Sequence, residues 1–202
     1  MPKAISSILL AGGKSSRMGK DKARLKLDGR LMVLQGVARK LLTISDEVIV
    51  ATDGRRYKNL NVRVKWVDDV YPGAGSLVGL YSGLKEASSD YALVVACDMP
   101  FLNLELLRYM IALPRDYDIL APRLGDKIEP LHAIYSRNCL PAIVRLLEAG
   151  HKKIVDLPGK VRVRYLSQEV VERYDPEHRS FFNINTPDQL VEARAIIEES
   201  RG

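Results

Sequence analysis

Cysteine is scarce in this sequence, and the positions of the cysteines argue against both structural disulfide bonds and a zinc site. The 202 residues include 2 cysteines, Cys97 and Cys139, and neither a CxxC pair nor a Cys/His spacing typical of zinc ligands is present. The sequence therefore predicts neither a disulfide framework nor a zinc site. Because the first residues also lack the pattern of a secretory signal, we expect the protein to be cytoplasmic.

Long hydrophobic runs are missing as well, so no membrane-spanning helix is predicted. No apolar stretch approaches the roughly 20 residues that cross a bilayer. Hydrophobic residues make up 47% of the chain and charged residues 28%, which is the composition of an ordinary globular protein. A chain of this length is enough for one substantial domain and short for two. We therefore predict a single domain over residues 1–202 and no membrane partner.

Aromatic residues are few, although the chain is basic. Its net charge is +6 and its isoelectric point is about 9.3, so anionic partners are favoured. The 3 Phe, 9 Tyr and 1 Trp do not alternate with Lys and Arg, as they do in many grooves that bind nucleic acid. Phosphorylated small molecules are therefore the expected partners, and nucleic acid is not.

Strand and helix patterns alternate along the whole chain. Short apolar runs predict strands at 4–10, 47–51, 62–67, 91–97, 118–121, 130–135 and 161–165. Apolar residues at helical spacing predict helices at 31–42, 77–87, 137–149 and 186–198, and another that begins after Asn103. This alternation predicts a three-layer α/β/α, Rossmann-like fold, in which helices cover both faces of a mostly parallel sheet. Ligands of such sheets bind beyond the carboxyl ends of the strands, which here are the loops 11–22, 52–56, 68–76 and 98–102.

Several residues are suited to ending helices. Asn103 and Thr186 are predicted to be N-caps, and Pro187 suits the first position of the last helix. Gly150 is predicted to close a helix at its C-terminus, because glycine adopts the left-handed conformation found there. These residues test the predicted helix ends independently of the hydrophobic pattern.

The loop after the first strand combines adjacent glycines with basic and hydroxyl side chains. It reads LAGGKSSRMGKDK over residues 10–22. Gly12 and Gly13 let backbone N–H groups approach an anion, while Arg17 and Lys22 supply positive charge. Such a loop suits a triphosphate. The alternative interpretation is a glycine-rich turn with a solvated basic face.

Two common phosphate-binding patterns are absent from this loop. The P-loop pattern requires a glycine five residues before Gly13, where Ile8 stands inside the predicted strand. The dinucleotide pattern GxGxxG fails because its glycine spacing is missing. The loop therefore belongs to neither of these classes.

A carboxylate follows the most apolar strand of the chain. Asp98 comes directly after residues 91–97 and before Met99 and Pro100, so it lies at the carboxyl edge of a central strand. Mg²⁺ takes hard oxygen ligands and often uses only one or two protein carboxylates together with phosphate oxygens and water. Asp98 is therefore a candidate magnesium ligand. A role as cap of the next helix is the alternative, and Asn103 is better placed for that role.

Acidic residues also follow two neighbouring strands. Asp68 and Asp69 end the strand that reaches Val67, and Asp53 ends the strand before it. Their carboxylates could accept hydrogen bonds from a nucleotide base or ribose. Solvated loop acids are the alternative for the pair, and Asp53 lies in a segment that is also a good turn sequence.

The first loop resembles the signature of the nucleotidyltransferase superfamily that includes sugar-nucleotide pyrophosphorylases. Those members usually have proline before the final lysine, whereas Asp21 stands here. The pattern RMGxDK is similar to the molybdenum cofactor guanylyltransferase family. Four later segments extend the resemblance over nearly the whole chain, namely YPGAGSLVGL at 71–80, CDMPFL at 97–102, EPLHAIY at 129–135 and FNINTP at 182–187. This sequence departs from the family at residues 76–78, where it has SLV and the family more often has PLA. The departure affects the expected shape of that loop and not the resemblance itself.

The resemblance implies a nucleotidyltransferase fold and a specific reaction. A nucleotide-binding part over about 1–102 and an acceptor-binding part over about 103–202 would together transfer GMP from GTP to the phosphate of molybdenum-molybdopterin, with Mg²⁺ as cofactor. Asp98 would hold the metal, and Arg17 and Lys22 would offset the phosphate charge. The residues implied in GTP binding are Leu10, Ala11, Gly12, Gly13, Lys22, Asp53, Asp69 and Asp98.

The acceptor side of the implied site is less defined. Asn183 and Asn185 would contact molybdopterin through their amides, although a turn before the last helix also explains them. The expected partners are GTP, molybdopterin, and molybdoenzyme apoproteins or chaperones. The rival hypotheses are a cytidylyltransferase, a sugar-phosphate nucleotidyltransferase, and a carrier that binds nucleotide and cofactor without catalysis.

Overall fold

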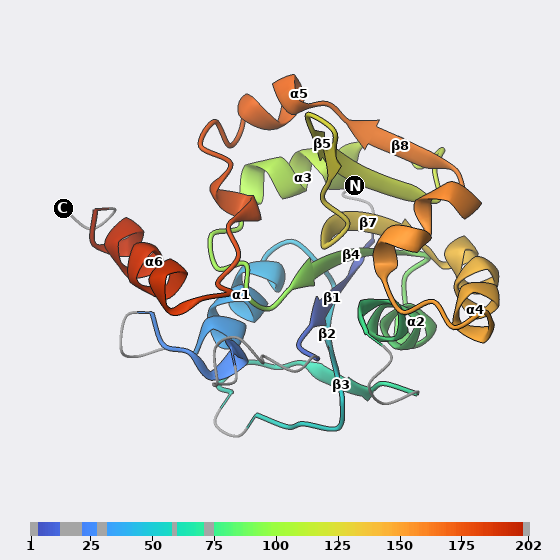
Figure 1. Ribbon diagram of the computed structural model, residues 1–202, viewed down its shortest axis with the longest axis horizontal. Helices are drawn as coiled ribbons and strands as arrows, with labels where there is room; N and C mark the ends of the chain where they lie inside the picture. The colour runs from blue at the N-terminus through green and yellow to red at the C-terminus, as the bar shows by residue number, and fades with distance from the viewer. Residues whose placement is uncertain (1–3, 13–21, 28–31, 58–59, 71–74, 200–202) are drawn as a thin grey trace.

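The computed structural model describes residues 4–12, 22–27, 32–57, 60–70 and 75–199, and for Lys22 only the backbone. Figure 1 shows one body in which strands and helices alternate along the chain. The strands are β1 (Ser6–Leu10), β2 (Glu47–Thr52), β3 (Lys65–Asp68), β4 (Tyr91–Ala96), β5 (Ile119–Leu124), β6 (Lys127–Ile128), β7 (His132–Ser136) and β8 (Val163–Leu166). The α-helices are α1 (Val33–Leu41), α2 (Ser76–Glu86), α3 (Leu104–Ala112), α4 (Leu140–Glu148), α5 (Gln168–Glu172) and α6 (Pro187–Glu199). Short 3₁₀ helices lie at Lys22–Arg24, Arg137–Cys139, Ile154–Asp156, Pro158–Lys160 and Arg179–Phe181.

The described strands form one eight-stranded sheet with a mostly parallel centre. Its order is β3-β2-β1-β4-β7-β5-β6, and β8 pairs with β5. The β1–β2, β1–β4, β2–β3 and β5–β8 pairs are parallel, whereas β7 runs antiparallel to both β4 and β5. The predicted α/β fold with a mostly parallel sheet is confirmed, and its strands come from both predicted parts of the chain. The reversed direction of β7 was not predicted.

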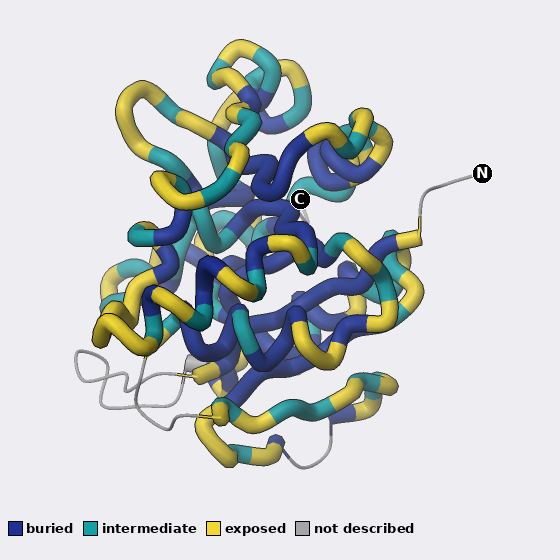
Figure 2. Tube along the Cα trace, turned by 90° about the vertical axis from the view of Figure 1, so that its right-hand side faces the viewer, coloured by how far each residue is buried: buried dark blue, intermediate teal, exposed yellow. Residues whose placement is uncertain are grey.

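Helices cover both faces of the sheet, as predicted. In Figure 1, α1 and α3 lie on one side of the strands, and α2 and α4 lie on the other. Successive residues of β1 point to opposite faces, so Leu9 packs in the cluster with α1 and α3, while Ile8 and Leu10 pack in the cluster with α2 and α4. Burial on both faces explains why the central strands are continuous apolar runs. Figure 2 shows these strands as the most deeply buried part of the chain.

Close packing of α2 against the sheet depends on a glycine within the helix. A Cβ atom at Gly83 would lie 2.6 Å from Cγ2 of Ile8, which is closer than real contacts allow. The helix tolerates glycine despite its low helix propensity because the missing side chain lets the helix approach β1. This explains why the sequence keeps glycines in a segment that otherwise reads as a helix.

The predicted helix ends are confirmed. The side chain of Asn103 accepts a hydrogen bond from the backbone N of Leu106 at 3.0 Å, and Gly150 adopts a φ of 84°. Helix α6 begins at Pro187, and Thr186 Oγ1 accepts a bond from the backbone N of Gln189 at 3.2 Å. Local capping chemistry therefore determines these ends, as expected from the sequence.

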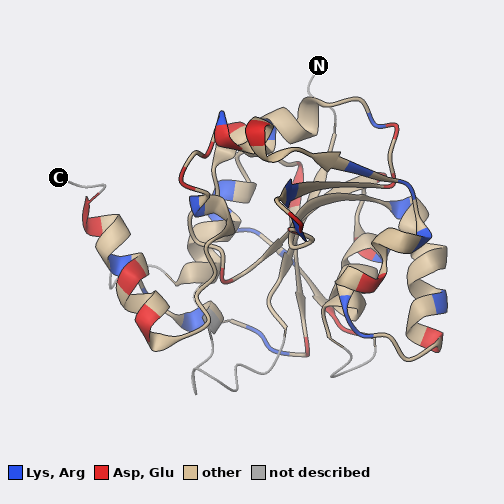
Figure 3. Cartoon of the chain, turned by 45° about the horizontal axis from the view of Figure 1, so that its top comes forward, with Lys and Arg blue, Asp and Glu red and all other residues tan. Residues whose placement is uncertain are grey.

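Charged residues do not gather on a single face. In the view of Figure 3, Lys and Arg alternate with Asp and Glu around the described chain, including along α6. Among the described helices, none combines the length and apolar character needed to cross a membrane.

Candidate active site

The carboxyl ends of four neighbouring strands meet at one edge of the sheet. The order β3-β2-β1-β4 puts the segments after these strands side by side. Three backbone hydrogen bonds extend the ladder past the strand ends, from Asp69 N to Thr52 O at 2.7 Å, from Ala11 N to Ala51 O at 2.9 Å, and from Cys97 N to Leu10 O at 3.0 Å. The structure thus brings the acidic residues after β2, β3 and β4 to the same edge as Ala11 and Gly12, which follow β1.

Asp98 lies in a turn that is held by the surrounding main chain. Met99 N donates to Ala96 O at 3.3 Å, and Ile184 N donates to Asp98 O at 3.0 Å. The bond from Ile184 ties this turn to the segment 182–187, which lies far away in sequence. The half-buried carboxylate of Asp98 is therefore carried by a fixed backbone at the carboxyl end of a central strand.

A lysine that sequence analysis missed braces the same turn from α1. Lys40 Nζ donates to the carbonyl oxygens of Pro100 at 3.1 Å and Leu102 at 3.3 Å. Burial lowers the pKa of Lys40, which shows that its ammonium group has left much of the solvent. No sequence signal identifies this contact, because 60 residues separate Lys40 from Pro100.

Lys40→Met is expected to loosen this turn. The substitution keeps an apolar stem but removes both charge-assisted hydrogen bonds, at a net cost of about 1–2 kcal/mol once the relief of burying an ammonium group is counted. For a domain of this size the melting temperature should fall by roughly 3–6 °C. Hydrogen exchange of the Met99 amide should accelerate, which mass spectrometry of the labelled protein would measure.

The exposed Lys85 of α2 provides a matched control. Lys85→Met changes the same charge at a position without a role in this turn, so its melting temperature should stay within about 1 °C of the parent protein. Equal behaviour of the Lys40 and Lys85 variants in both measurements would contradict the bracing role.

Asp69 is the most unusual acidic group at this edge. Its Oδ1 atom is buried without a hydrogen-bond partner among the described residues. A Cβ atom added at Gly12 would lie 3.4 Å from Asp69 Oδ2, and one added at Gly79 would lie 3.6 Å from Oδ1. Burial, and next the charges of Asp53 and Asp68, together raise the pKa of Asp69 to about 6. A buried carboxylate oxygen without a hydrogen-bond partner is costly to the fold, so Asp69 is a strong candidate for a ligand contact.

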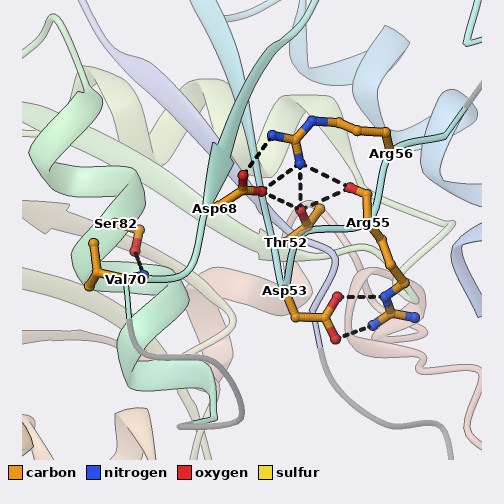
Figure 4. A network of polar contacts seen from close by, with 7 residues as sticks. All are labelled: Thr52, Asp53, Arg55, Arg56, Asp68, Val70 and Ser82. Atoms are coloured by element: carbon orange, nitrogen blue, oxygen red, sulfur yellow. Dashed lines mark hydrogen bonds and ion pairs between the residues drawn. The ribbon is translucent and has the colours of Figure 1, made fainter.

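Asp68 is in the opposite situation, although it is the neighbouring residue. Arg56 Nη1 donates to its Oδ1 at 2.5 Å and Arg56 Nη2 donates to its Oδ2 at 2.9 Å, while Thr52 Oγ1 lies 3.4 Å from Oδ1. Figure 4 shows this network at the end of β2, with the guanidinium of Arg56 between Asp68 and Thr52. The hydrogen bond from Arg56 lowers the pKa of Asp68. The sequence did not show which of Asp68 and Asp69 faces a ligand, and the structure distinguishes them by the ion pair of Asp68 with Arg56. Arg56 was not among the predicted residues.

Asp53 is held by its own turn. Arg55 Nε donates to Asp53 Oδ1 at 2.6 Å, and Arg55 Nη2 donates to Oδ2 at 3.1 Å (Figure 4). Both side chains are about one-third exposed, at 34% for Arg55 and 30% for Asp53. A ligand contact by Asp53 would have to share its carboxylate with this arginine, whereas Asp69 has no such competitor among the described residues.

The described part of the glycine-rich loop begins inside the sheet. Leu10 is a buried residue of β1, and the N–H group of Ala11 already donates to Ala51. Gly12 follows and lies beside Asp69 and Asp53. Gly13 and Arg17 fall outside the described residues, as does the side chain of Lys22, so their predicted roles stay predictions.

The predicted acceptor residues flank the segment that contacts Asp98. Asn183 and Asn185 stand on either side of Ile184, whose N–H group donates to Asp98 O. The side chain of Asn183 donates to Phe181 O at 2.8 Å, and the backbone N of Asn185 donates to Gln189 Oε1 at 2.8 Å. The turn before α6 is therefore real, and it also brings these residues next to the metal-ligand candidate.

A larger hollow lies away from this edge and is not part of the candidate site. It has a volume of about 670 Å³ and is lined by residues such as Asp118, Arg145 and Arg162. Asp118 precedes β5, at the opposite end of the strand from the candidate site, and its carboxylate accepts bonds from the backbone N, Nε and Nη2 of Arg162. These bonds join Arg162, which precedes β8, to the start of β5. Asp118 and Arg162 therefore have a structural role in pairing the two strands.

Comparison with protein-family models identifies the domain. The model described as the MobA-like NTP transferase domain matches residues 7–165. This range includes most of β1, the glycine-rich segment and the sheet edge that carries Asp53, Asp69 and Asp98. The match therefore covers the acidic residues at this edge, whereas Asn183 and Asn185 lie beyond its end.

Similar proteins and structures agree with this match. A probable molybdenum cofactor guanylyltransferase of Pelotomaculum thermopropionicum is 40% identical over 196 residues, which are 97% of this chain and 95% of that protein. A molybdenum cofactor guanylyltransferase of Desulfosudis oleivorans is 38% identical over 200 residues, covering 98% of both chains. The crystal structure of molybdopterin-guanine dinucleotide biosynthesis protein A from Archaeoglobus fulgidus superposes with a TM-score of 0.83 at 27% identity, over 96% of this chain and 100% of that one.

Proposed function

Because the chain belongs to the family of MobA-like NTP transferases, it is a nucleotidyltransferase, and we propose that it transfers GMP from GTP to the phosphate of molybdenum-molybdopterin. The observation that supports this most directly is the sequence of groups along one sheet edge. The unsatisfied Asp69 carboxylate lies beside Gly12, and Asp98 lies on the next strand beyond β1. This order suits a nucleoside triphosphate that is bound at its base or ribose on one side and at its phosphates on the other.

Magnesium fits the donor set at this edge. Among the described residues no three His, Cys, Asp or Glu side chains form a cluster able to enclose a metal ion. Mg²⁺ needs no such cage, since it is often held by one or two carboxylates while substrate phosphates and water complete its shell. Asp98 is the residue that would hold it. When bound, the ion would neutralise phosphate charge and orient the reacting groups.

The reaction proposed is a displacement at the α-phosphorus of GTP. A phosphate oxygen of molybdopterin forms the new bond to that phosphorus, the bond to the oxygen bridging to the β-phosphate breaks, and pyrophosphate leaves with that electron pair. The attacking phosphate is already anionic near neutral pH, so no general base is required. The protein contributes positioning and charge stabilisation, as in other phosphoryl-type transfers.

Each predicted residue has a place in this proposal. Asp69 would accept hydrogen bonds from the guanine or ribose, with Asp53 at the margin of the same pocket. Arg17 and Lys22 would offset the triphosphate charge, and the loop from Leu10 to Gly13 would supply its backbone. Asn183 and Asn185 would contact the acceptor, because the segment that carries them is bonded to the Asp98 turn.

The cellular setting follows from the same proposal. The product would be molybdopterin guanine dinucleotide, so its recipients would be molybdoenzyme apoproteins or the chaperones that serve them. A cytoplasmic location suits a reaction that draws on cytoplasmic GTP.

A panel of nucleotides tests the choice of base. GTP with Mg²⁺ should raise the melting temperature most among the four triphosphates, by about 5–10 °C at 100 times its dissociation constant. Omitting Mg²⁺ should reduce this shift, because Asp98 would then face the phosphates without a bridging cation. Thermal scans with each triphosphate measure the shift, and pyrophosphate release in the presence of molybdopterin measures the transfer.

The same panel can overturn the proposal. Greater stabilisation and turnover with CTP would assign a cytidylyltransferase instead. Stabilisation by GTP with no pyrophosphate release in the presence of molybdopterin would favour a carrier without catalysis.

A further inference from the structure

The sheet edge that carries Asp98 continues beyond β4 into a region with no assigned role. Strand β7 is antiparallel to β4 and to β5, so β5 runs parallel to β4, and the end of β5 lies at the same edge as Asp98. Apart from Asp98 itself, the described candidates for nucleotide binding lie on the other side of β4, at the ends of β1, β2 and β3, namely Leu10, Ala11, Gly12, Asp53 and Asp69. A second substrate that meets the triphosphate at Asp98 must therefore approach from the side of β7 and β5.

A pocket of about 460 Å³ lies on that side. It is bounded by the β5–β6 hairpin, by residues 177–182 and by α6, and it is lined by residues such as Leu124, Glu129, Arg179, Phe182 and Glu192. In Figure 1, α6 extends away from the body after the segment that follows α5. The pocket thus combines the carboxyl end of β5 with the C-terminal segment that contacts Asp98.

One wall of the pocket belongs to the segment that contacts the Asp98 turn. The ring of Phe182 lies 5.7 Å from the ring of Phe101, which is three residues after Asp98. Ile184, two residues after Phe182, donates its N–H group to Asp98 O. Two extended residues span at most about 7 Å. The segment that lines the pocket is therefore bonded to the main chain of the Asp98 turn.

The lining of the pocket is suited to a flat heterocycle with N–H donors. Phe181 and Phe182 supply aromatic surface, and the side chain of Glu129 is only 7% exposed, with Oε1 2.7 Å from Lys127 Nζ. A carboxylate can accept two parallel N–H donors, which is the pattern of a 2-amino-4-oxo-pyrimidine edge. Arg179 also lines the pocket, where its guanidinium pairs with the carboxylate of Glu177.

Backbone strain marks the same wall of the pocket. His178 lines the pocket and has a φ of 53°. Among the described residues other than glycine, His178 alone has a positive φ. Such conformations cost free energy and cluster where function requires a fixed shape. The hydrogen bonds from Arg179 N and Ser180 N to the carboxylate of Asp175, at 3.1 and 2.8 Å, hold this segment in place.

We propose that this pocket binds the pterin ring of the acceptor, with Glu129 accepting its amino and ring N–H groups and Phe182 covering its face. The proposal rests on the proposed function, because it takes the acceptor to be a pterin. Guanine carries the same hydrogen-bonding edge as the pterin. The position of the pocket beyond β4 assigns it to the acceptor, since Gly12 and Asp69 lie on the nucleotide side.

Steady-state kinetics of the Glu129→Gln variant distinguish an effect on molybdopterin binding from an effect on GTP binding. The amide places an N–H group where the ligand also donates, so the KM for molybdopterin should rise about 10–100-fold. The KM for GTP should stay within about twofold, because the nucleotide side is untouched. Glu148→Gln on the exposed end of α4 is the matched control and should change neither KM.

A binding measurement without turnover completes the test. A pterin that carries a phosphomethyl group at C6 should bind the wild-type protein and lose at least about tenfold in affinity to Glu129→Gln, followed by the fluorescence of the pterin itself. Phe182→Leu should weaken the same binding, which keeps the test valid if Glu129→Gln does not fold. Unchanged pterin binding in the folded variants, or a rise in the KM for GTP instead, would overturn the pocket assignment. Absence of guanylyl transfer by the wild-type protein together with normal pterin binding would overturn the proposed function and leave the pocket assignment standing.

Discussion

Replacing Asp98 by asparagine is expected to abolish nucleotidyl transfer while leaving the fold intact. The amide keeps the size of the side chain but removes the negative charge that would hold Mg²⁺. Loss of a metal contact that stabilises the reacting phosphates costs several kcal/mol in the transition state, which corresponds to a fall in kcat of about 10³-fold or more. Pyrophosphate release at saturating GTP and molybdopterin measures this fall.

The fold should survive because the Asp98 turn is held by its main chain. The bonds from Cys97 N to Leu10 O, from Met99 N to Ala96 O and from Ile184 N to Asp98 O do not involve the carboxylate. The melting temperature of Asp98→Asn should therefore stay within about 3 °C of the parent protein. Binding of Mn²⁺ in the presence of GTP, followed by electron paramagnetic resonance, should weaken at least about tenfold.

Asp116 provides a control of the same chemistry at a distance. Its side chain is 70% exposed and pairs with Arg164, before β5 at the opposite edge of the sheet. Asp116→Asn should keep full turnover and Mn²⁺ binding. If Asp98→Asn retained more than about one-tenth of the magnesium-dependent turnover, Asp98 could not be the residue that holds the metal.

The position of the candidate site could be predicted because it depends on local patterns. Continuous apolar runs located β1 and β4, and the rule that ligands bind at the carboxyl ends of parallel strands selected the loops after them. Asn103, Gly150 and Thr186 fixed helix ends through capping chemistry that needs only neighbouring residues. The structure brings Gly12, Asp53, Asp69 and Asp98 to one edge of the sheet, as these patterns required.

The direction of β7 could not be predicted in the same way. A short strand that is buried along its whole length has no alternation that distinguishes parallel from antiparallel pairing. Its reversal results from tertiary packing, since β7 enters between β4 and β5 from the side of the Asp98 edge. That reversal makes β5 parallel to β4, so the end of β5 lies at the same edge as Asp98.

Side-chain pairing across long sequence distances was also beyond prediction. Asp68 and Asp69 are adjacent in sequence, but only the structure shows that they differ. The carboxylate of Asp68 pairs with Arg56, whereas that of Asp69 lies toward Gly12 and Gly79. Lys40 reaches the Asp98 turn from 60 residues away. Such contacts depend on how elements pack, and no spacing rule contains that information.

Replacing Asp69 by asparagine is expected to stabilise the protein and to impair its use of GTP. The folded state raises the pKa of Asp69 to about 6, mainly through burial and next through the charges of Asp53 and Asp68. A rise of this size from the ordinary value near 4 corresponds to at most about 3 kcal/mol, and partial exposure of the side chain reduces this to roughly 1–2 kcal/mol. At pH 8 the variant should therefore melt about 3–6 °C higher than the parent protein.

The gain in stability should depend on pH in a defined direction. Because the folded pKa lies above the unfolded one, the folded state binds this proton more tightly, and ionisation of Asp69 costs stability as pH rises from about 4 through about 6. The difference in melting temperature between variant and parent should thus be small near pH 4, grow across this window and stay constant above it. A constant difference at all pH values would show that burial of the charge is not its cause.

Asp68→Asn distinguishes a ligand contact from a general loss of acidic charge at the end of β3. Asp68 is paired with Arg56 at the surface, so its replacement should change stability by no more than about 1 kcal/mol and leave the KM for GTP within about twofold. Asp69→Asn should raise the KM for GTP about 10–100-fold, because a buried acceptor of ligand N–H or O–H groups becomes an amide. Stabilisation together with loss of substrate binding would mean that the fold keeps an unsatisfied carboxylate for its ligand, at a cost in stability. Stabilisation with an unchanged KM would instead assign Asp69 a place outside the nucleotide contacts.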